Sequence, residues 1–486
     1  MIKLNKYKNQ NVAVLGLGKT GLSAINALMN SGAKVYAWDD DEGQILNAKE
    51  IYKKCNFIHP KEYNWQEINA LILSPGISFT YPEPHWIVKL TKSFECKIKS
   101  DIELFLEAKT RNQKVVGVTG TNGKSTTTSL IGHILELAGK RVGIGGNLGN
   151  PVLNLSENEE IYVIELSSFQ LELLNSTSVV PALDAGINVS CDELQYKTTQ
   201  ITEVDIVVLL NITPDHIDRH GSMENYIATK LKLINGSKTA VIGCDNKITA
   251  DIFNNFTGSK VSISGRHSVK NGISLIDNNL FDYGKCLPID DAKINLISNA
   301  ENVASAYAVC KLLEVDSSTI INGIRSFSGL RHRNELLGKI RNVSFVNDSK
   351  ATNAESSEKA ILSYGNIYWI VGGRSKEGGI TQLNEYFSRI KKAFLIGEST
   401  GNFANIMKNK VDFVECSNLK NAFELACEEA FDHKEEITIL LSPACASLDQ
   451  WKNFAERGEA FCKMFKNLKD SLTIAHTTSI EYQSGK

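Results

Sequence analysis

The stretch Gly120-Thr121-Asn122-Gly123-Lys124-Ser125-Thr126-Thr127 directly follows the apolar residues 115–118. A strand, a glycine turn and a helix that opens with a lysine and hydroxyl groups form a phosphate cradle, because backbone N–H groups and the helix N-terminus bind phosphate oxygens. Lys124 adds positive charge, and Ser125 or Thr126 can reach a magnesium ion. The stretch predicts a site for ATP, whose expected binding residues here are Gly120, Thr121, Asn122, Gly123, Lys124, Ser125 and Thr126.

The match to the phosphate-loop pattern GxxxxGK[ST] is incomplete, because Val118 stands where the pattern has its first glycine. The core GxxGKST remains. A glycine turn with a chance lysine would give the same letters. The apolar run before it and the helical pattern after it favour a phosphate loop.

Composition limits the class of protein. The chain has 486 residues, enough for about three domains, with 42% hydrophobic and 22% charged residues, as in a globular protein. A net charge of −2 argues against nucleic acid or an anionic membrane as the main partner. The polar start does not resemble a signal peptide, and no apolar run is long enough to span a bilayer. Ten cysteines without a CxxC pair suggest reduced thiols, so we expect a cytoplasmic protein.

Short apolar runs alternate with helical patterns in three series, which predicts an α/β fold with mostly parallel sheets and ligands at the carboxyl ends of the strands. We expect three domains: a Rossmann-like N-terminal domain over residues 1–100, a P-loop-type central ATPase domain over 101–328, and a Rossmann-like C-terminal domain over 329–486. The polar tail after Asp470 is expected to be loose. The predicted strands cover residues 12–15, 35–38, 71–73, 115–118, 162–165, 206–210, 344–346, 368–371, 393–396 and 437–441.

Polar side chains follow two further strands of the central series. Glu165 ends one strand, where a carboxylate beside a phosphate loop can bind magnesium, although a solvated loop glutamate would have the same sequence. His216 follows the next strand and is a candidate metal ligand or substrate contact, since neutral imidazole binds metals readily. Lys230 lies on a predicted helix, where an exposed lysine is the ordinary interpretation.

A second glycine turn, Gly16-Leu17-Gly18-Lys19-Thr20-Gly21, follows the first predicted strand. Asp39 lies about twenty residues further on, as in the dinucleotide fingerprint. Taken alone, this pattern is as compatible with NAD or FAD binding as with another nucleotide.

The blocks GTNGKST, ELSSFQLE and NxTxDHxDRH, in this order, resemble the central domain of the Mur ligases of peptidoglycan precursor synthesis. The resemblance extends over nearly the whole chain. It implies an enzyme that joins D-glutamate to UDP-N-acetylmuramoyl-L-alanine through an acyl phosphate, with ATP and two Mg²⁺ ions. The expected partners are these small-molecule substrates, without nucleic acid or a membrane, and the protein is expected to be a monomer.

The resemblance also assigns the catalytic residues Lys124, Glu165, His216 and Lys230. The lysine at the position of Lys230 is carbamylated by CO2 in that family, and the product carboxylate binds the second magnesium. An amine must be neutral to react with CO2, so a depressed pKa is implied for Lys230. The implied metal ligands are Ser125, Thr126, Glu165, His216 and Lys230 as its carbamate.

For the N-terminal turn, the resemblance implies a UDP-substrate site in place of a dinucleotide site. Lys19, Thr20 and Gly21 would lie against the diphosphate, with Ser74, Pro75 and Gly76 nearby. Asn147, within Gly145-Gly146-Asn147-Leu148-Gly149, would contact the same substrate. A turn asparagine with positive φ is the alternative for Asn147.

In the third domain, the resemblance places Arg333 and Asp348 at the ATP. Two lysines and two hydroxyls suit a dicarboxylate such as D-glutamate. Cys445 is expected to be a small buried residue and not a nucleophile. The implied D-glutamate-binding residues are Lys350, Thr352, Lys376, Ser447, Leu448 and Phe454.

The chain departs from the family at three places. Arg331 replaces the proline of GLPHR, and Ser298 replaces the histidine of HNxxN, although Asn299 and Asn302 remain to bind adenine. The segment from about Glu172 to Gln200 is longer than in the family, as is typical of a surface loop.

Four alternatives are weaker. A folylpolyglutamate synthase shares the GTNGK-type loop but lacks a separate first domain, and the diamino-acid-adding Mur ligases carry an Asp-Asn-Pro-Arg motif that is missing here. An NAD-dependent oxidoreductase would not need the central phosphate loop. A non-catalytic nucleotide-binding module would leave Glu165, His216 and Lys230 unexplained.

Overall fold

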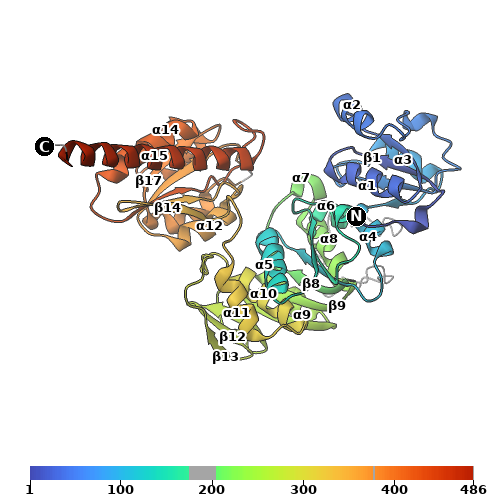
Figure 1. The fold of residues 1–486 in the computed structure, drawn as a ribbon, viewed down its shortest axis with the longest axis horizontal. Helices are drawn as coiled ribbons and strands as arrows, with labels where there is room; N and C mark the ends of the chain where they lie inside the picture. Colours follow the sequence, from blue (N-terminus) through green and yellow to red (C-terminus); the bar gives the residue numbers. More distant parts are fainter. Residues whose placement is uncertain (175–203, 376–377, 485–486) are drawn as a thin grey trace. The chain divides into compact units, whose positions relative to one another are not determined.

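The computed structural model describes residues 1–174, 204–375 and 378–484 (Figure 1). The predicted long segment between Glu172 and Gln200 lies outside the described residues from position 175 onward. The chain divides into two compact units. Unit 1 comprises residues 1–291 and 300–327, and unit 2 comprises residues 292–299 and 328–486. Each of the three predicted domains contains one sheet, while the boundaries at residues 100 and 328 stay predictions.

The first sheet of unit 1 has the strand order β2-β1-β3-β4, and all of its pairs are parallel. Buried apolar residues fill its central strands, which explains why they read as uninterrupted apolar runs. Helix α1 joins β1 to β2 directly after the first glycine turn. The elements are β1 (Asn11–Leu15), α1 (Lys19–Asn30), β2 (Lys34–Trp38), α2 (Glu42–Ile51), β3 (Ala70–Leu73), α3 (Trp86–Ser93) and β4 (Ile98–Lys99).

The second sheet has nine strands in the order β13-β12-β11-β10-β9-β8-β5-β7-β6. The pairs from β11 to β6 are parallel, and β12 and β13 add two antiparallel strands at one edge. The strands are β5 (Lys114–Thr119), β6 (Val142–Gly146), β7 (Ile161–Glu165), β8 (Val204–Leu209), β9 (Ser237–Gly243), β10 (Ser259–Ser264), β11 (Gly272–Ile276), β12 (Asn279–Asp282) and β13 (Lys285–Pro288).

Strand β5 lies between β7 and β8, so the three central motifs, which follow these strands, meet at one sheet edge. Helix α5 packs closely on β6, since an ideal Cβ at Gly132 would lie only 2.1 Å from Ile144 Cδ1. The helices are α4 (Asp101–Ala108), α5 (Lys124–Leu137), α6 (Ser168–Leu173), α7 (Ile217–His220), α8 (Met223–Asn235), α9 (Lys247–Asn255), α10 (Ala300–Leu312) and α11 (Ser317–Ser326).

Unit 2 contains a six-stranded sheet in the order β14-β15-β19-β16-β17-β18, parallel except for the β14–β15 pair. Its elements are β14 (Glu335–Ile340), β15 (Val343–Asn347), α12 (Ala354–Ser363), β16 (Ile367–Gly372), β17 (Ile390–Ile396), α13 (Thr400–Met407), β18 (Phe413–Ser417), α14 (Leu419–Phe431), β19 (Ile437–Leu441) and α15 (Phe454–Ser484). The predicted α/β class with mostly parallel sheets is confirmed.

The tail after Asp470, which is expected to be loose, is helical, because helix α15 continues from Phe454 to Ser484. Phe461 and Phe465 pack this helix against the sheet of unit 2. Once a helix is nucleated, each added residue costs little, so a polar sequence can continue it.

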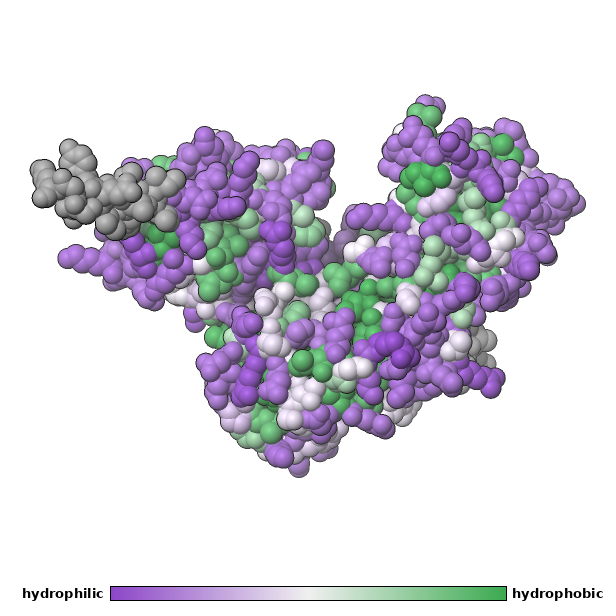
Figure 2. All heavy atoms as spheres, viewed as in Figure 1, coloured by the Kyte–Doolittle hydropathy of each residue, from purple (hydrophilic) through white to green (hydrophobic). Residues whose placement is uncertain are grey.

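Hydrophilic residues predominate on the face of the molecule seen in Figure 2, with hydrophobic residues in small groups among them. Among the described residues, no helix combines the length and the apolar character needed to cross a membrane.

Candidate active site

The phosphate loop lies between β5 and α5, as the sequence predicts. Gly123 precedes the helix with a φ of +87°, and Gly120 has a φ of +148°, conformations that favour glycine. The loop is held by the segment after β8: Thr121 N donates to Asn211 O at 2.8 Å, and Asn122 N donates to Asn211 Oδ1 at 2.8 Å. The loop's shape is therefore set by the neighbouring strand as well as by its own glycines.

Two lysines converge on the carbonyl of Gly120. Lys124 Nζ donates to Gly120 O at 2.9 Å and to Thr121 O at 2.7 Å, while Lys230 Nζ donates to Gly120 O at 3.0 Å. Lys230 was expected from the residues alone to be an exposed helix lysine. Its side chain is instead 1% exposed, and Nζ lies 4.7 Å from the centroid of the Tyr226 ring.

Burial holds the pKa of Lys230 well below its usual range, and the charge of Lys124 lowers it further, while Asp215 acts in the opposite direction. A buried ammonium loses its hydration, which penalises the charged form. The amine required by carbamylation is thus favoured at this position. The depressed pKa expected from the resemblance is found, whereas the carbamate itself stays a prediction.

Glu165 lies at the same sheet edge as the phosphate loop, because Val118 of β5 pairs with Glu165 of β7. The carboxylate is 2% exposed, and its Oε1 accepts a hydrogen bond from Asn147 Nδ2 at 2.6 Å. Within the described part of the chain, Oε2 is buried without a hydrogen-bond partner. An orphaned carboxylate oxygen is costly unless it has a ligand, so this site fits a hard cation such as Mg²⁺.

Ser125 and Thr126 open helix α5 and are each 5% exposed. Their hydroxyls supply the oxygen ligands that Mg²⁺ prefers. Asn147 is not among the residues with positive φ, so the turn interpretation does not apply. Its side chain instead holds Glu165, which gives it a role that the motif alone did not suggest.

His216 caps the start of helix α7 with a left-handed φ of +55°. Its side chain is 45% exposed, and Nε2 lies 3.5 Å from Asp215 Oδ2. Its ring centroid lies 5.0 Å from that of Phe169, a residue of α6. The imidazole is accessible to a metal or substrate, as a ligand must be.

Sequence reasoning missed the network below the phosphate loop. Asn211 Nδ2 donates to Glu301 Oε2 at 2.7 Å, and Thr127 Oγ1 donates to Asn302 Oδ1 at 3.3 Å. Asn211 opens the NxTxDHxDRH block, so its place at a strand end was the signal that could have found it. Asn302, predicted to bind adenine, is 4% exposed and packs beneath the loop. Asn299 donates to Asn295 O at 2.9 Å, and the adenine role of both residues stays a prediction.

The N-terminal glycine turn is closed by side chains of the neighbouring strands. Ser74 Oγ donates to Gly16 O at 2.8 Å, and Asp39 Oδ2 accepts from Leu17 N at 2.6 Å. Gly21 is required, because a Cβ there would lie 1.8 Å from Gly16 O. Lys19 and Thr20 open helix α1, and Pro75 and Gly76 follow Ser74 after β3.

A cavity of about 360 Å³ lies beside this turn at the carboxyl end of β2. The His59 and Trp86 rings stack in its wall with centroids 5.5 Å apart. No sequence pattern predicts this cavity, since its residues come from separate segments. They are Trp38, Asp39, Asp40, Glu42, His59, Lys61 and Trp86.

In unit 2, Asp348 follows β15 and accepts hydrogen bonds from Ser442 Oγ at 2.8 Å and Asn334 N at 2.9 Å. Burial raises the pKa of Asp348 to about 7, an effect that the Ser442 hydrogen bond opposes. Arg333 lies in the loop before β14, and its charge also lowers this pKa. The predicted ATP contacts of unit 2 are therefore electrostatically linked.

The predicted D-glutamate residues differ in exposure. Lys350 Nζ lies 4.1 Å from the centroid of the Phe454 ring. Ser447 is 3% exposed and Leu448 is 59% exposed, while Thr352 is half-buried. Lys376 lies outside the described residues.

Arg457 was missed and connects the loops of this region. Its Nε donates to Ser349 Oγ at 3.0 Å, and its Nη2 donates to Ser349 O at 2.9 Å and to Cys445 O at 3.1 Å. Burial lowers the pKa of Arg457 to about 10. Cys445 is fully buried and burial raises its thiol pKa to about 12, so it is not a nucleophile, as expected.

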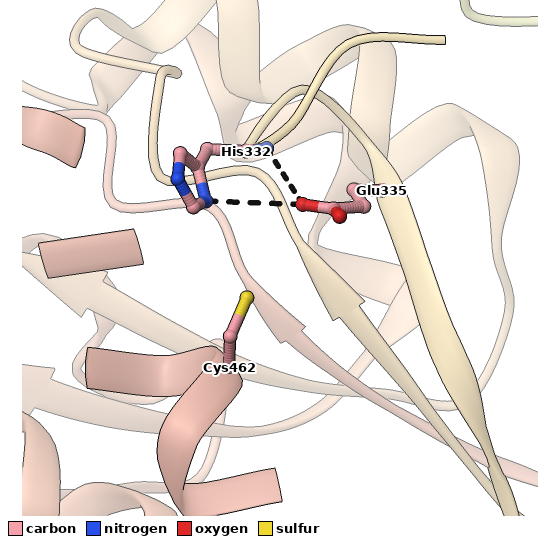
Figure 3. A group of neighbouring side chains, drawn as sticks. All are labelled: His332, Glu335 and Cys462. Carbon is pink, nitrogen blue, oxygen red and sulfur yellow. Dashed lines mark hydrogen bonds and ion pairs between the residues drawn. The ribbon is translucent and has the colours of Figure 1, made fainter. Parts of the chain in front are cut away.

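Arg331, which replaces the family's proline, forms an ion pair with Glu459 at 2.7 Å. Figure 3 shows its neighbour His332 beside Glu335 and Cys462, whose ligand atoms lie within 4.8 Å of one another. However, Asn347 Nδ2 lies 3.0 Å from His332 Nδ1 and 3.2 Å from Cys462 Sγ. One amide thus occupies two of the three donors, so this group is a hydrogen-bonded junction that anchors the loop before Arg333.

Two family models and several known proteins are similar to this chain. The family model described as "Mur ligase middle domain" matches residues 118–309. The family model described as "Mur ligase MurD-like, N-terminal domain" matches residues 10–90. UDP-N-acetylmuramoylalanine--D-glutamate ligase of Wolbachia sp. subsp. Brugia malayi (strain TRS) is 67% identical, covering 97% of this chain and 99% of the relative. The protein of the same name from Rickettsia bellii (strain RML369-C) is 40% identical, covering 95% and 98%.

Two solved structures share the fold at low identity. UDP-N-acetylmuramate-alanine ligase MurC from Thermotoga maritima has a TM-score of 0.55 and 15% identity, covering 94% of this chain and 100% of that chain. UDP-N-acetylmuramoylalanyl-D-glutamyl-2,6-diaminopimelate--D-alanyl-D-alanyl ligase from Acinetobacter baumannii has a TM-score of 0.52 and 14% identity, covering 90% and 89%. The fold expected from the resemblance is confirmed, and identity to the bacterial relatives over almost the entire length shows that the chain belongs to the Mur ligase family.

Proposed function

We propose that this protein is an ATP-dependent ligase that joins D-glutamate to the L-alanine carboxyl of UDP-N-acetylmuramoyl-L-alanine in peptidoglycan precursor synthesis. The observation that carries the proposal is the convergence of Lys124, Lys230 and Glu165 at the phosphate loop. A motor or regulatory nucleotide site needs the loop and a cation. It does not need a second, buried amine beside them.

The reaction follows from the weakness of a carboxylate as an electrophile. The L-alanine carboxylate attacks the γ-phosphorus of ATP, the bond to the ADP oxygen breaks, and an acyl phosphate forms. Lys124 and the N–H groups at the start of α5 stabilise charge on the transferring phosphoryl group. The neutral amine of D-glutamate then attacks the acyl carbon. An amide and inorganic phosphate result, and the amine releases a proton.

The metal ligands proposed here are Ser125, Thr126 and Glu165 for one Mg²⁺, and His216 with the carbamate of Lys230 for a second. When bound, Mg²⁺ supplies positive charge to the phosphate and carboxylate oxygens. The buried Oε2 of Glu165 supports the first site. The lowered pKa of Lys230 supports the second, because only a neutral amine reacts with CO2.

We propose that the UDP part of the substrate binds the N-terminal sheet, with its diphosphate at Lys19, Thr20, Gly21, Ser74, Pro75 and Gly76. The adjoining cavity combines stacked rings with acidic side chains, which suits a flat base bearing N–H donors. The NAD alternative is less favoured, because both oxygens of Asp39 already accept backbone N–H groups, from Leu17 and Asp41. The acidic residue of a dinucleotide site must instead reach a ribose.

The D-glutamate site proposed in unit 2 comprises Lys350, Thr352, Lys376, Ser447, Leu448 and Phe454. Two ammonium groups and two hydroxyls match two carboxylates. Arg333 and Asp348 are the proposed ATP contacts of this unit, and Asn299 and Asn302 those of the adenine. The described cysteines are free thiols, in keeping with the proposed cytoplasmic location.

The test is phosphate release by the purified protein with ATP, Mg²⁺ and UDP-N-acetylmuramoyl-L-alanine, while the amino acid is varied. D-Glutamate is expected to be the preferred acceptor. Equal or faster turnover with L-glutamate, L-alanine or a diamino acid would overturn the substrate assignment. Lys124→Ala is the matched control, because it should abolish phosphate release with every acceptor.

A further inference from the structure

Arg219 of α7 bonds to backbone carbonyls of the loop that follows β3. Its Nη2 donates to Ile77 O at 2.9 Å, and its Nη1 donates to Tyr81 O at 2.9 Å and to Ser78 Oγ at 3.2 Å. A planar guanidinium carries five N–H donors in a fixed fork, so it can satisfy several acceptors in a defined geometry, whereas a lysine ammonium offers three donors on a flexible stem. Helix α7 thereby holds, through hydrogen bonds, the loop that begins with Ser74, Pro75 and Gly76.

The charge of Arg219 is balanced by Glu172 at the end of α6. Arg219 Nη2 lies 3.0 Å from Glu172 Oε2, and the two side chains are only 11% and 5% exposed. The hydroxyl of Thr80, in the same loop after β3, donates to Glu172 Oε1. Removing one partner of such a buried pair leaves an uncompensated charge, so the pair holds a defined geometry.

Arg219 and the candidate metal ligand His216 both lie beside the Phe169 ring. The guanidinium carbon of Arg219 lies 5.3 Å from the Phe169 ring centroid, and the His216 ring lies 5.0 Å from it. Gly221, just after α7, allows close approach of the loop, since a Cβ there would lie 2.9 Å from the Tyr81 ring. The loop after β3 and His216 are thus connected through Arg219 and Phe169.

We propose that Arg219, with Glu172 as its counter-charge, is a positioning residue that fixes the diphosphate-binding loop relative to His216. This inference rests on the proposed function, in which the UDP end of one substrate binds at that loop and its carboxylate end reacts near His216. A substrate held at both ends reacts only if the two holding sites keep their separation. A displacement of about 1 Å can cost about 100-fold in rate.

The experiment compares Arg219→Gln, Arg219→Lys and the double variant Arg219→Gln/Glu172→Gln with the wild type. For Arg219→Gln, we expect kcat to fall about 100-fold, with the Kd for ATP unchanged. We expect UDP alone to bind several-fold more weakly, because the loop after Gly76 is released. Arg219→Lys should recover part of kcat. All rates are normalised to active sites counted by ATP binding, which removes the contribution of unfolded protein.

Arg325→Gln is the matched control. Arg325 lies on α11 and also donates to backbone carbonyls, those of Asp290 and Pro288. It should leave kcat and UDP affinity unchanged. If Arg219→Gln does not fold, the double variant removes both charges together and is expected to show the same losses. Wild-type kcat or wild-type UDP affinity in the Arg219 variants would overturn the positioning role. Failure of the wild type to use D-glutamate would instead overturn the proposed function, and UDP affinity would still decide the role of Arg219.

Discussion

The two glycine turns of unit 1 have the same local architecture and different surroundings. Each follows a buried parallel strand and opens a helix, α1 after the turn at residues 16–21 and α5 after the loop at residues 120–123. At the first turn, the carboxylate of Asp39 accepts from Leu17 N. At the second, the side-chain nitrogens of Lys124 and Lys230 both donate to Gly120 O.

The chemistry of a glycine turn therefore depends on the side chains that surround it, which come from helices as well as from neighbouring strands. The backbone geometry supplies N–H groups at both places. Only the central loop is surrounded by two amines and a buried carboxylate, the arrangement that stabilises a transferring phosphoryl group. Under the proposed function, the first turn holds a nucleotide without reacting with it.

The largest effect should come from Lys230→Ala. We expect turnover to fall by about 10³-fold or more, because the variant loses the proposed second metal ligand. Short-chain carboxylates should restore part of the activity if a carbamate is the missing group. The measurement is phosphate release with D-glutamate. Lys247→Ala, at an exposed lysine of α9, is the control and should retain kcat. Near-normal turnover by Lys230→Ala would remove Lys230 from the mechanism.

A smaller effect should distinguish the two turns in stability. Gly123 has a φ of +87°, and a Cβ there would lie 2.2 Å from Asn302 Oδ1. Gly123→Ala should therefore cost about 1–3 kcal/mol of unfolding free energy through backbone strain alone. Gly18 has a φ of −68° and no atom within 4 Å of its ideal Cβ, so Gly18→Ala should cost less than about 1 kcal/mol. Urea denaturation measures both, and equal costs would contradict the structural difference.

The burial of Lys230 also predicts a pH dependence of stability. Its folded pKa lies well below its usual value, so above the folded pKa the unfolded chain binds a proton that the folded protein does not. Unfolding free energy therefore rises with pH in this range, by at most about 1.4 kcal/mol per pH unit. In CO2-free buffer, Lys230→Met should remove this slope, whereas Lys19→Met should keep it. A wild-type slope in Lys230→Met would show that other groups cause the dependence.

The sheets could be predicted from the sequence because buried parallel strands read as apolar runs. Residues 437–441 match β19, and residues 162–165 match β7 to within one residue. Strand β13 was missed because it is short and mostly exposed, so it lacks the apolar run of a buried strand. Its pairing depends on the hairpin with β12, a tertiary contact.

The candidate site was predicted less completely than the fold. Glu165 and Lys124 stand at the ends of elements, where the strand–turn–helix pattern points to them. Lys230 is buried only because α8 brings it against the phosphate loop, and no spacing in α8 indicates that contact. The resemblance to the family supplied what the pattern could not. Arg219 and Asn211 were missed because their partners lie in segments far away in the sequence.

The smallest effect should come from Asp39 at the first turn. Asp39→Asn keeps one acceptor oxygen, so one of the two backbone N–H groups, Leu17 or Asp41, loses its bond. A neutral hydrogen bond is worth about 1 kcal/mol, which predicts a Kd for UDP about 5-fold weaker with kcat unchanged. Isothermal titration with UDP measures this, and Lys124→Ala should leave UDP affinity unaltered. NADH is expected to bind neither the wild type nor Asp39→Asn. Micromolar binding of NADH to the wild type, lost in Asp39→Asn, would instead make the first turn a dinucleotide site and remove the functional contrast between the two turns.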